Sequence, residues 1–123
     1  MAPDDDQVID ALYEAITSGD IDAVADLYDD GVAVWHNVTD RAVDRDASLA
    51  ILRHFVRTVG ARRYEILERR HWEGGAMQRH IVHGRVGDDA FYAPVCIRFE
   101  LRDGRITRID EYVDSAAIAA LMP

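Results

Sequence analysis

Apolar residues recur at helical spacing in the first half of this chain and at a spacing of two in the second half. The first helical face contains Val8, Ile9, Leu12, Tyr13 and Ile16. An acidic run at 4–6 precedes this face, where carboxylates can cap a helix and complement its dipole, and Gly19 ends it. Two further helices are predicted, one capped by Asp20 and ending before Gly31, the other ending at Gly60. Their apolar positions are Ile21, Val24, Leu27 and Tyr28, then Leu49, Leu52, Phe55, Val56 and Val59.

Between the second and third helices, the stretch 32–38 alternates like a strand and then presents Trp35, His36 and Asn37 in a row. A strand turns successive side chains to opposite faces, so Trp35 and Asn37 point one way and His36 the other. Polar side chains at the place where a strand should feed a core predict a lined cavity. The segment 39–46 that follows is polar and typical of a turn.

From Arg62 onward, four strands are predicted at about 62–72, 76–86, 90–102 and 105–113, with a short closing helix over 116–121. Hairpin turns at 74–75, 87–89 and 103–104 should pair neighbouring strands antiparallel. The face of the third strand predicted to pack on the helices contains Phe91, Ala93, Val95, Ile97, Phe99 and Leu101. These elements predict one α+β domain over residues 1–123, with a cone-shaped, curved antiparallel sheet wrapped around three helices from the N-terminal half.

Composition narrows the class of protein and its partners. A chain of 123 residues with 49% apolar content is large enough to form one core. The net charge of −9 argues against nucleic acid and anionic membranes as partners, since both require clustered cations. The single cysteine, Cys96, excludes an internal disulfide and favours a reducing, cytoplasmic compartment. No secretory signal or membrane-spanning run is recognised, so a soluble protein is expected.

No cofactor or metal ion is predicted, and a second copy of the chain is the expected protein partner. The sequence has no Gly-rich phosphate loop, and no His, Cys and carboxylate set has ligand spacing. The outer face of the third predicted strand carries Tyr92, Pro94 and Cys96 among arginines and glutamates. Such a mixed aromatic and polar surface favours a homodimer through the outer face of the sheet.

The order of elements and three short motifs resemble the nuclear transport factor 2-like superfamily, in its SnoaL-like and limonene epoxide hydrolase-like branch. The motifs are Ser18-Gly19-Asp20, Tyr28-Asp29-Asp30, and Asp103-Gly104-Arg105-Ile106 leading to Glu111-Tyr112-Val113-Asp114. The resemblance covers nearly the whole chain and implies a cystatin-like α+β barrel that commonly dimerises. It implies a small-molecule pocket, but this fold hosts enzymes and binding modules alike.

The resemblance also implies where a site would lie. Limonene epoxide hydrolases carry a Tyr-x-Asn pair on the first strand, and Trp35 and Asn37 stand there in this chain. Their Asp-Arg-Asp relay falls on Gln78, His80 and Glu111. Epoxide hydrolysis would need a polarising acid at Gln78, which an amide supplies poorly.

The ketosteroid isomerases provide a second comparison within the same superfamily. Near the position of their catalytic carboxylate this chain has His36, and near their protonated Asp it has Val95 or Cys96. Neither catalytic acid is kept, so steroid isomerisation by that mechanism is not expected.

His80 and Glu111 are the predicted catalytic residues, because a neutral imidazole can accept a proton near pH 7 while a carboxylate holds its tautomer or acts as the base. The predicted substrate-binding residues are Trp35, Asn37, Gln78, Val95 and Ile97. The leading interpretation is a cofactor-free acid–base enzyme of isomerase, cyclase or hydrolase type, acting on a compact apolar metabolite. The same polar residues are also compatible with a network that binds without reacting. Epoxide hydrolase-like activity and a non-catalytic ligand-binding or dimerisation module are the alternatives.

Overall fold

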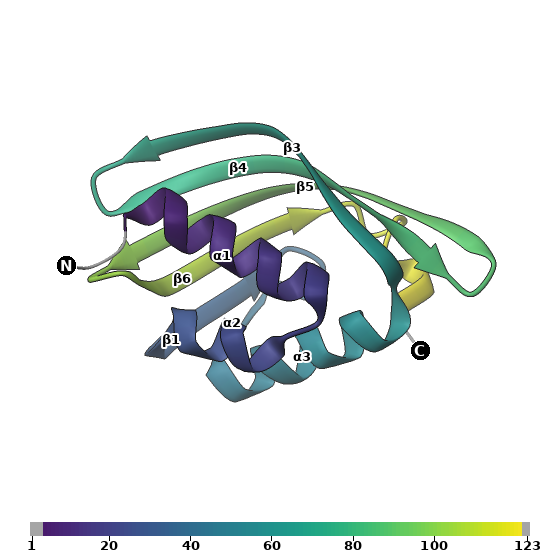
Figure 1. Cartoon of the computed structure of the whole chain (residues 1–123), viewed down its shortest axis with the longest axis horizontal. Helices are drawn as coiled ribbons and strands as arrows, with labels where there is room; N and C mark the ends of the chain where they lie inside the picture. The colour runs from purple at the N-terminus through teal and green to yellow at the C-terminus, as the bar shows by residue number, and fades with distance from the viewer. Residues whose placement is uncertain (1–3, 122–123) are drawn as a thin grey trace.

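The computed structural model describes residues 4–121, in which helices pack on one face of a six-stranded sheet (Figure 1). The elements in chain order are α1 (Asp5–Ser18), α2 (Ile21–Leu27), β1 (Tyr28–His36), β2 (Arg41–Val43), α3 (Arg45–Thr58), β3 (Gly60–Trp72), β4 (Gly75–Val86), β5 (Asp89–Arg102), β6 (Arg105–Val113) and the 3-10 helix η1 (Ala119–Leu121). The predicted α+β class and its three helices are confirmed. Within residues 4–121, no helix is long and apolar enough to cross a membrane.

The sheet is mixed and unclosed, with strand order β2-β1-β6-β5-β4-β3. Strands β3 to β6 form the predicted antiparallel meander, but β1 runs parallel to β6 and β2 pairs antiparallel with β1. The expectation of a wholly antiparallel sheet is therefore corrected. Hairpin turns dictate the direction of β3 to β6, whereas the long connection between β1 and β6 leaves both directions open. Strand β2 lies inside the segment 39–46, where only a turn was expected.

Aspartate side chains begin each of the three helices. Asp4 accepts the backbone N–H of Gln7 at 2.8 Å, Asp20 that of Ala23 at 3.1 Å and Asp44 that of Ala47 at 2.9 Å. These bonds satisfy N–H groups that have no partner inside the helix. Asp44 thus starts α3 well before its first buried apolar residue, which is why the predicted helix began too late.

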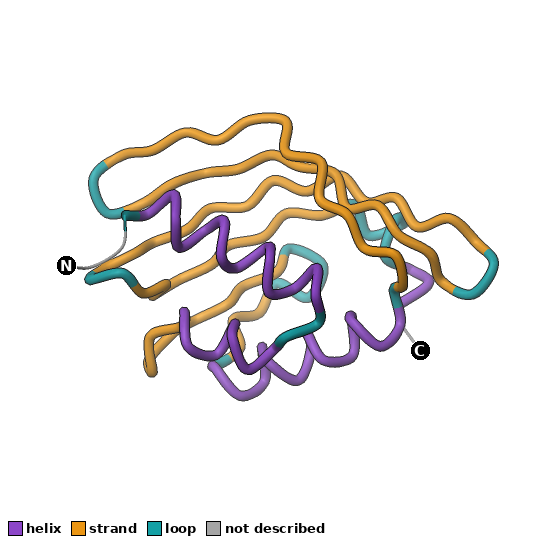
Figure 2. Tube along the Cα trace, viewed as in Figure 1, coloured by secondary structure: helices purple, strands orange, loops and turns teal. Residues whose placement is uncertain are grey.

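Strand β5 is the central wall of the core. All six of its predicted inward residues are buried, whereas Tyr92 on the other face is 54% exposed. The face assignment from alternation is therefore confirmed. Strand β3 breaks its register with β4 between Ile66 and Glu68, and such bulges bend a sheet. Figure 2 shows the long strands curving over the helix layer, which leaves a concave face beneath them.

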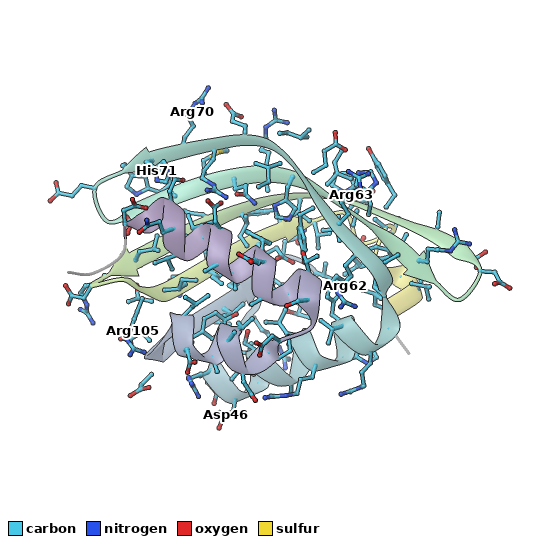
Figure 3. All side chains as sticks on the ribbon, in the orientation of Figure 1. Asp46, Arg62, Arg63, Arg70, His71 and Arg105 are labelled. Atoms are coloured by element: carbon cyan, nitrogen blue, oxygen red, sulfur yellow. The ribbon has the colours of Figure 1, made fainter. Side chains whose placement is uncertain are left out.

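Arg62 fastens the two long helices to the sheet. From β3, its guanidinium donates to the carbonyls of Ile16 and Thr17 at the end of α1, both at 3.1 Å. It also donates to Val56 at 2.8 Å and Val59 at 2.6 Å, at the end of α3. The last carbonyls of a helix lack partners in the helix, so one side chain satisfies both ends. Figure 3 shows Arg62 between these elements.

Candidate functional site

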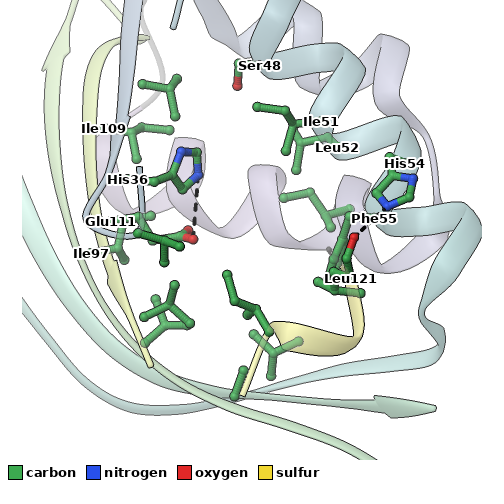
Figure 4. A pocket seen from close by; sticks show the side chains of 18 of the residues that line it. His36, Ser48, Ile51, Leu52, His54, Phe55, Ile97, Ile109, Glu111 and Leu121 are labelled. Atoms are coloured by element: carbon green, nitrogen blue, oxygen red, sulfur yellow. Dashed lines mark hydrogen bonds and ion pairs between the residues drawn. The ribbon is translucent and has the colours of Figure 1, made fainter. Parts of the chain in front are cut away.

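A largely apolar cavity of about 550 Å³ lies between the helices and the concave face of the sheet. Its walls come from α1, α3, β1, β3, β4, β5 and β6, with η1 at one side (Figure 4). The polar or ionisable side chains that line it are Tyr13, Tyr28, His36, Thr39, Ser48, His54, Tyr64, His80 and Glu111. Within residues 4–121, Glu111 is the one carboxyl group in this lining. The cavity thus offers a few specific polar contacts to an otherwise apolar ligand.

Glu111 faces His36 across the parallel pair β1 and β6. The two residues are aligned in the register of these strands, and Oε1 of Glu111 lies 3.7 Å from Nε2 of His36. Figure 4 shows both side chains meeting inside the pocket. Burial raises the pKa of Glu111 above its usual 4.5, while the nearby His36 opposes that rise. The carboxyl therefore holds a proton more readily than a carboxyl in water, and a protonated His36 would stabilise its ionised form.

His80 lies on β4 in a hydrogen-bonded setting. It is 2% exposed, and its Nδ1 lies 2.9 Å from Nε2 of Gln78, which is itself fully buried. Oε1 of Gln78 accepts a hydrogen bond from Nε of Arg69 at 2.9 Å. Burial lowers the pKa of His80 from 6.5 to about 4, and the charge of Arg69 adds to this effect. His80 is therefore a neutral imidazole at pH 7.

The two predicted catalytic residues line the same cavity but contact different partners. Through Ile97 of β5, the register aligns Glu111 with Gln78, whereas His80 is aligned through Val95 with Val113. The strand β5 and this offset separate the two side chains, and within residues 4–121 neither has the other as a hydrogen-bond or ion-pair partner. The partner that sequence reasoning missed is His36. Its position on the same strand face as the buried Val32 and Val34 is the signal that identifies it.

Trp35 and Asn37 were predicted to line the pocket, but neither belongs to the cavity lining. Trp35 donates its Nε1 hydrogen to Asp40 at 3.1 Å and packs against Tyr112, with ring centroids 5.0 Å apart. Asn37 bonds the backbone of Val113 twice, at 3.1 Å and 2.9 Å, and so ties the end of β1 to β6. Because Val32 and Val34 bury the other face of β1, these two side chains turn outward.

The remaining predicted binding residues lie on the inner side of the sheet. Val95 and Ile97 line the cavity, while Gln78 stands behind His80 and does not reach the lining. A role for these residues in substrate binding stays a prediction. No group of three or more His, Cys, Asp or Glu side chains within residues 4–121 is placed to hold a metal ion.

Three phenols line the cavity and act as neutral groups. Burial raises the pKa values of Tyr13, Tyr28 and Tyr64, and the charge of Glu111 adds to each rise. Tyr28 shares a hydrogen bond with Ser48 at 3.3 Å, whereas the hydroxyl of Tyr13 is buried without a partner in the described part of the chain. These side chains offer hydrogen bonds rather than charge.

Solved structures of other proteins share the fold of this chain. An epoxide hydrolase of M. tuberculosis, described as LEH-like, has a TM-score of 0.76 at 22% identity, over 94% of this chain and 87% of that one. IdmH, a putative polyketide cyclase from Streptomyces antibioticus, has a TM-score of 0.82 at 17% identity, over 95% and 96%. A hypothetical protein with a ketosteroid isomerase-like fold from Catenulispora acidiphila, in complex with trimethylamine, has a TM-score of 0.80 at 13% identity, over 98% and 93%. These likenesses concern the fold alone.

Family membership rests on the sequence itself. No curated protein matches the chain. Residues 9–109, however, match the SnoaL-like domain family, and this span includes both β1 and the strand β4 that bears Gln78 and His80. Because the match covers most of the sequence and the fold agrees with it, the chain belongs to the SnoaL-like domain family of the nuclear transport factor 2-like superfamily.

Proposed function

We propose that this protein is a cofactor-free acid–base enzyme that acts on a compact, largely apolar metabolite, with Glu111 as the group that transfers the proton. One observation carries this proposal. The carboxyl group of Glu111, whose pKa is raised, lines an apolar cavity of about 550 Å³, and the imidazole of His36 lies 3.7 Å from it. A catalytic acid or base works best when its pKa lies near the working pH, and burial moves Glu111 in that direction.

The reaction type follows from the positions of the polar groups. Ionised Glu111 would remove a proton from a carbon next to a carbonyl, and the electrons of the broken C–H bond would pass to the carbonyl oxygen as an enolate. Protonated Glu111 would then return the proton to the same or another carbon. Alternatively, the enolate carbon would attack a second carbonyl within the ligand, the electrons of that C=O π bond would pass to its oxygen, and the resulting alkoxide would take the proton from Glu111. His36 would stabilise the carboxylate before and after transfer. The proton carrier is thus Glu111 rather than His80, because the lowered pKa of His80, about 4, makes its imidazole a poor base.

The cyclase or isomerase type fits this pocket better than epoxide hydrolysis. Among the structural relatives, IdmH is described as a putative polyketide cyclase and another protein as an LEH-like epoxide hydrolase. Epoxide opening needs an acid that polarises the ring oxygen. The residue at that place, Gln78, is an amide and is screened from the cavity by its bond to His80.

Deuterium exchange tests the proposal without knowledge of the natural substrate. Compact ketones such as 2-decalone are incubated with the protein in D2O, and uptake at the carbons beside the carbonyl is followed by NMR. Wild-type protein should accelerate uptake, and Glu111→Gln should abolish the acceleration while ketone binding persists. The matched control is Glu65→Gln, a carboxyl on β3 that pairs with His83 outside the cavity lining. Binding of ketones by wild type with no accelerated exchange would make the protein a binding module instead.

We also propose that the outer face of the sheet joins two copies of the chain in the cytoplasm. Tyr92 and Tyr112 on this face are 54% and 55% exposed, and Cys96 is exposed beside them. Exposed aromatic side chains favour association because they bury much apolar area. Sedimentation at micromolar concentration should give a dimer mass, which Tyr92→Glu should reduce to that of a monomer. A monomer mass for wild type would remove this proposal.

A further inference from the structure

A continuous chain of polar contacts runs from the first turns of α1 to His80 in the lining of the cavity. Nη1 of Arg69 lies 2.8 Å from carboxylate oxygens of both Asp6 and Asp10, which belong to α1. Nε of the same guanidinium donates to Gln78, whose other amide end meets His80. The Arg69 side chain is only 13% exposed, so the charge lies mostly inside the protein. Acid–base chemistry at Glu111 uses none of these contacts.

The chemistry of each group fixes the direction of every hydrogen bond in this chain. A guanidinium has donors and no acceptor, so the Gln78 atom that faces Arg69 must be the oxygen. The amide nitrogen, which only donates, then faces Nδ1 of His80. Nδ1 must accept, and the proton of a neutral imidazole consequently sits on Nε2.

We propose that Arg69 is a positioning residue that acts through Gln78 to fix His80 as its Nε2–H tautomer, so that the cavity presents a permanent hydrogen-bond donor to an acceptor oxygen of the ligand. Such an oxygen belongs to a carbonyl or ether group. The tautomer stands on the contacts alone, whereas the choice of a carbonyl ligand rests on the proposed function.

The surroundings of His80 support this assignment. Its ring lines the cavity, and Nε2 has no hydrogen-bond partner within residues 4–121. The rings of Tyr13 and Tyr64 stand edge-on to it, with centroids 5.1 Å and 5.2 Å away. The lowered pKa of about 4 keeps the imidazole neutral, so its free nitrogen retains the same single proton over the physiological range. An ammonium group would meet this N–H unfavourably.

The tautomer is measured directly in the free protein by long-range ¹H–¹⁵N correlation of the histidine rings. Wild-type His80 should show the Nε2–H pattern. Arg69→Met should give a mixture of tautomers, because the amide of Gln78 is then free to rotate, and Arg69→Lys should restore a single form. Gln78→Glu, which keeps Arg69, should move the proton to Nδ1, because a carboxylate accepts and does not donate. Arg79→Met, at an arginine that pairs with Glu68 on the outer face, is the matched control and should leave the pattern unchanged.

Two results would overturn the proposal. One is an Nδ1–H pattern in the wild type, and the other is a tautomer unaffected by both Arg69→Met and Gln78→Glu. If Arg69→Met fails to fold, the wild-type and Gln78→Glu spectra decide alone.

A binding comparison tests the ligand part. Wild-type protein should bind 2-decalone about 10-fold more tightly than decalin, which has no oxygen, as one hydrogen bond provides. Gln78→Glu should reduce this ratio to near one, and an unchanged ratio would overturn the role of the donor. If wild type prefers the ketone but catalyses no deuterium uptake, the proposed function fails while the donor stands. If wild type catalyses deuterium uptake but binds 2-decalone no more tightly than decalin, the proposed function stands and the donor role of His80 fails.

Discussion

The cavity has two polar walls, one formed by Glu111 and His36 and the other by His80, and they differ in hydrogen bonding and burial. On β1 and β6, Glu111 and His36 approach to 3.7 Å, a separation too long for a hydrogen bond, and each keeps part of its surface accessible. On β4, the hydrogen bond of His80 to Gln78 measures 2.9 Å and the imidazole is almost wholly buried. The first pair is therefore not held by a hydrogen bond between its two members. The second group is held in one state, which suits it to orient a ligand and not to exchange protons with it.

Burial shifts the pKa values of Glu111 and His80 in opposite directions, and both shifts favour the neutral form. It raises the pKa of Glu111 and lowers that of His80, because in both cases the apolar surroundings penalise the charged form. An acid and a base that are both neutral can coexist in such a cavity. In the proposed mechanism Glu111 transfers the proton because its pKa moves toward neutrality, whereas that of His80 moves away from it.

The largest expected effect separates catalysis from stability at Glu111. Glu111→Gln should lower exchange or turnover by about 100-fold or more, because the proton-transferring group is lost. A raised pKa means that Glu111 contributes its full stability below the unfolded pKa and loses it as pH rises through the folded value. At pH 7 the amide should therefore stabilise the fold, by about 1 kcal/mol, measured by urea unfolding. An active but destabilised variant would contradict both statements.

The lowered pKa of His80 should make the free energy of unfolding depend on pH. The pKa of His80 is lowered from 6.5 to about 4, so its neutral form stabilises the fold above pH 6.5 and this contribution is lost as pH falls toward 4. The full effect is about 3 kcal/mol. Because Glu111 titrates with the opposite sign, urea unfolding is compared in Glu111→Gln and Glu111→Gln/His80→Asn. The slope between pH 6.5 and 4.5 should be smaller in the double variant, and an unchanged slope would show that His80 does not contribute to it.

Both polar sides of the cavity depend on the packing of α1 and α3 against the sheet. Substitution of Arg62, which joins these elements, tests that packing. Arg62→Met should reduce the free energy of unfolding by about 2 to 3 kcal/mol, because four helix-end carbonyls lose a charged donor. Arg63→Met, at the next position of β3, serves as the control. The His80 tautomer should persist in the folded fraction of Arg62→Met. A stability equal to that of the wild type would show that water replaces the guanidinium without loss.

The smallest effect is expected outside the cavity, at Trp35. Trp35→Phe removes the indole bond to Asp40 but keeps a ring against Tyr112. Ligand affinity should stay within about twofold, and the free energy of unfolding within about 0.5 kcal/mol. Ile97→Ala, on the inner face, provides the contrast and should weaken ligand binding. A large loss of ligand affinity in Trp35→Phe would show instead that the indole contributes to the binding site.

Much of the fold can be read from local patterns in the sequence. Aspartates that cap helices act within a few residues, and the alternation from Phe91 to Leu101 specifies its own inner face because a strand has a period of two. The hairpin turns likewise define β3 to β6. Local patterns therefore identified the helix layer and the meander, whereas the inward placement of Glu111 and His80 was implied by the resemblance to the limonene epoxide hydrolases.

Only the tertiary structure decided how β1 and β6 meet. In β1 either face is plausible by alternation, and the face that carries Val32, Val34 and His36 turned inward because it packs against the helices. The parallel pairing of β1 with β6 then placed His36 beside Glu111, a contact between residues far apart in the sequence. No local pattern encodes that register. The same holds for Arg69 and Gln78, whose contact depends on the pairing of β3 with β4 past a bulge, and so the hydrogen bonds that fix His80 emerge only when the sheet is assembled.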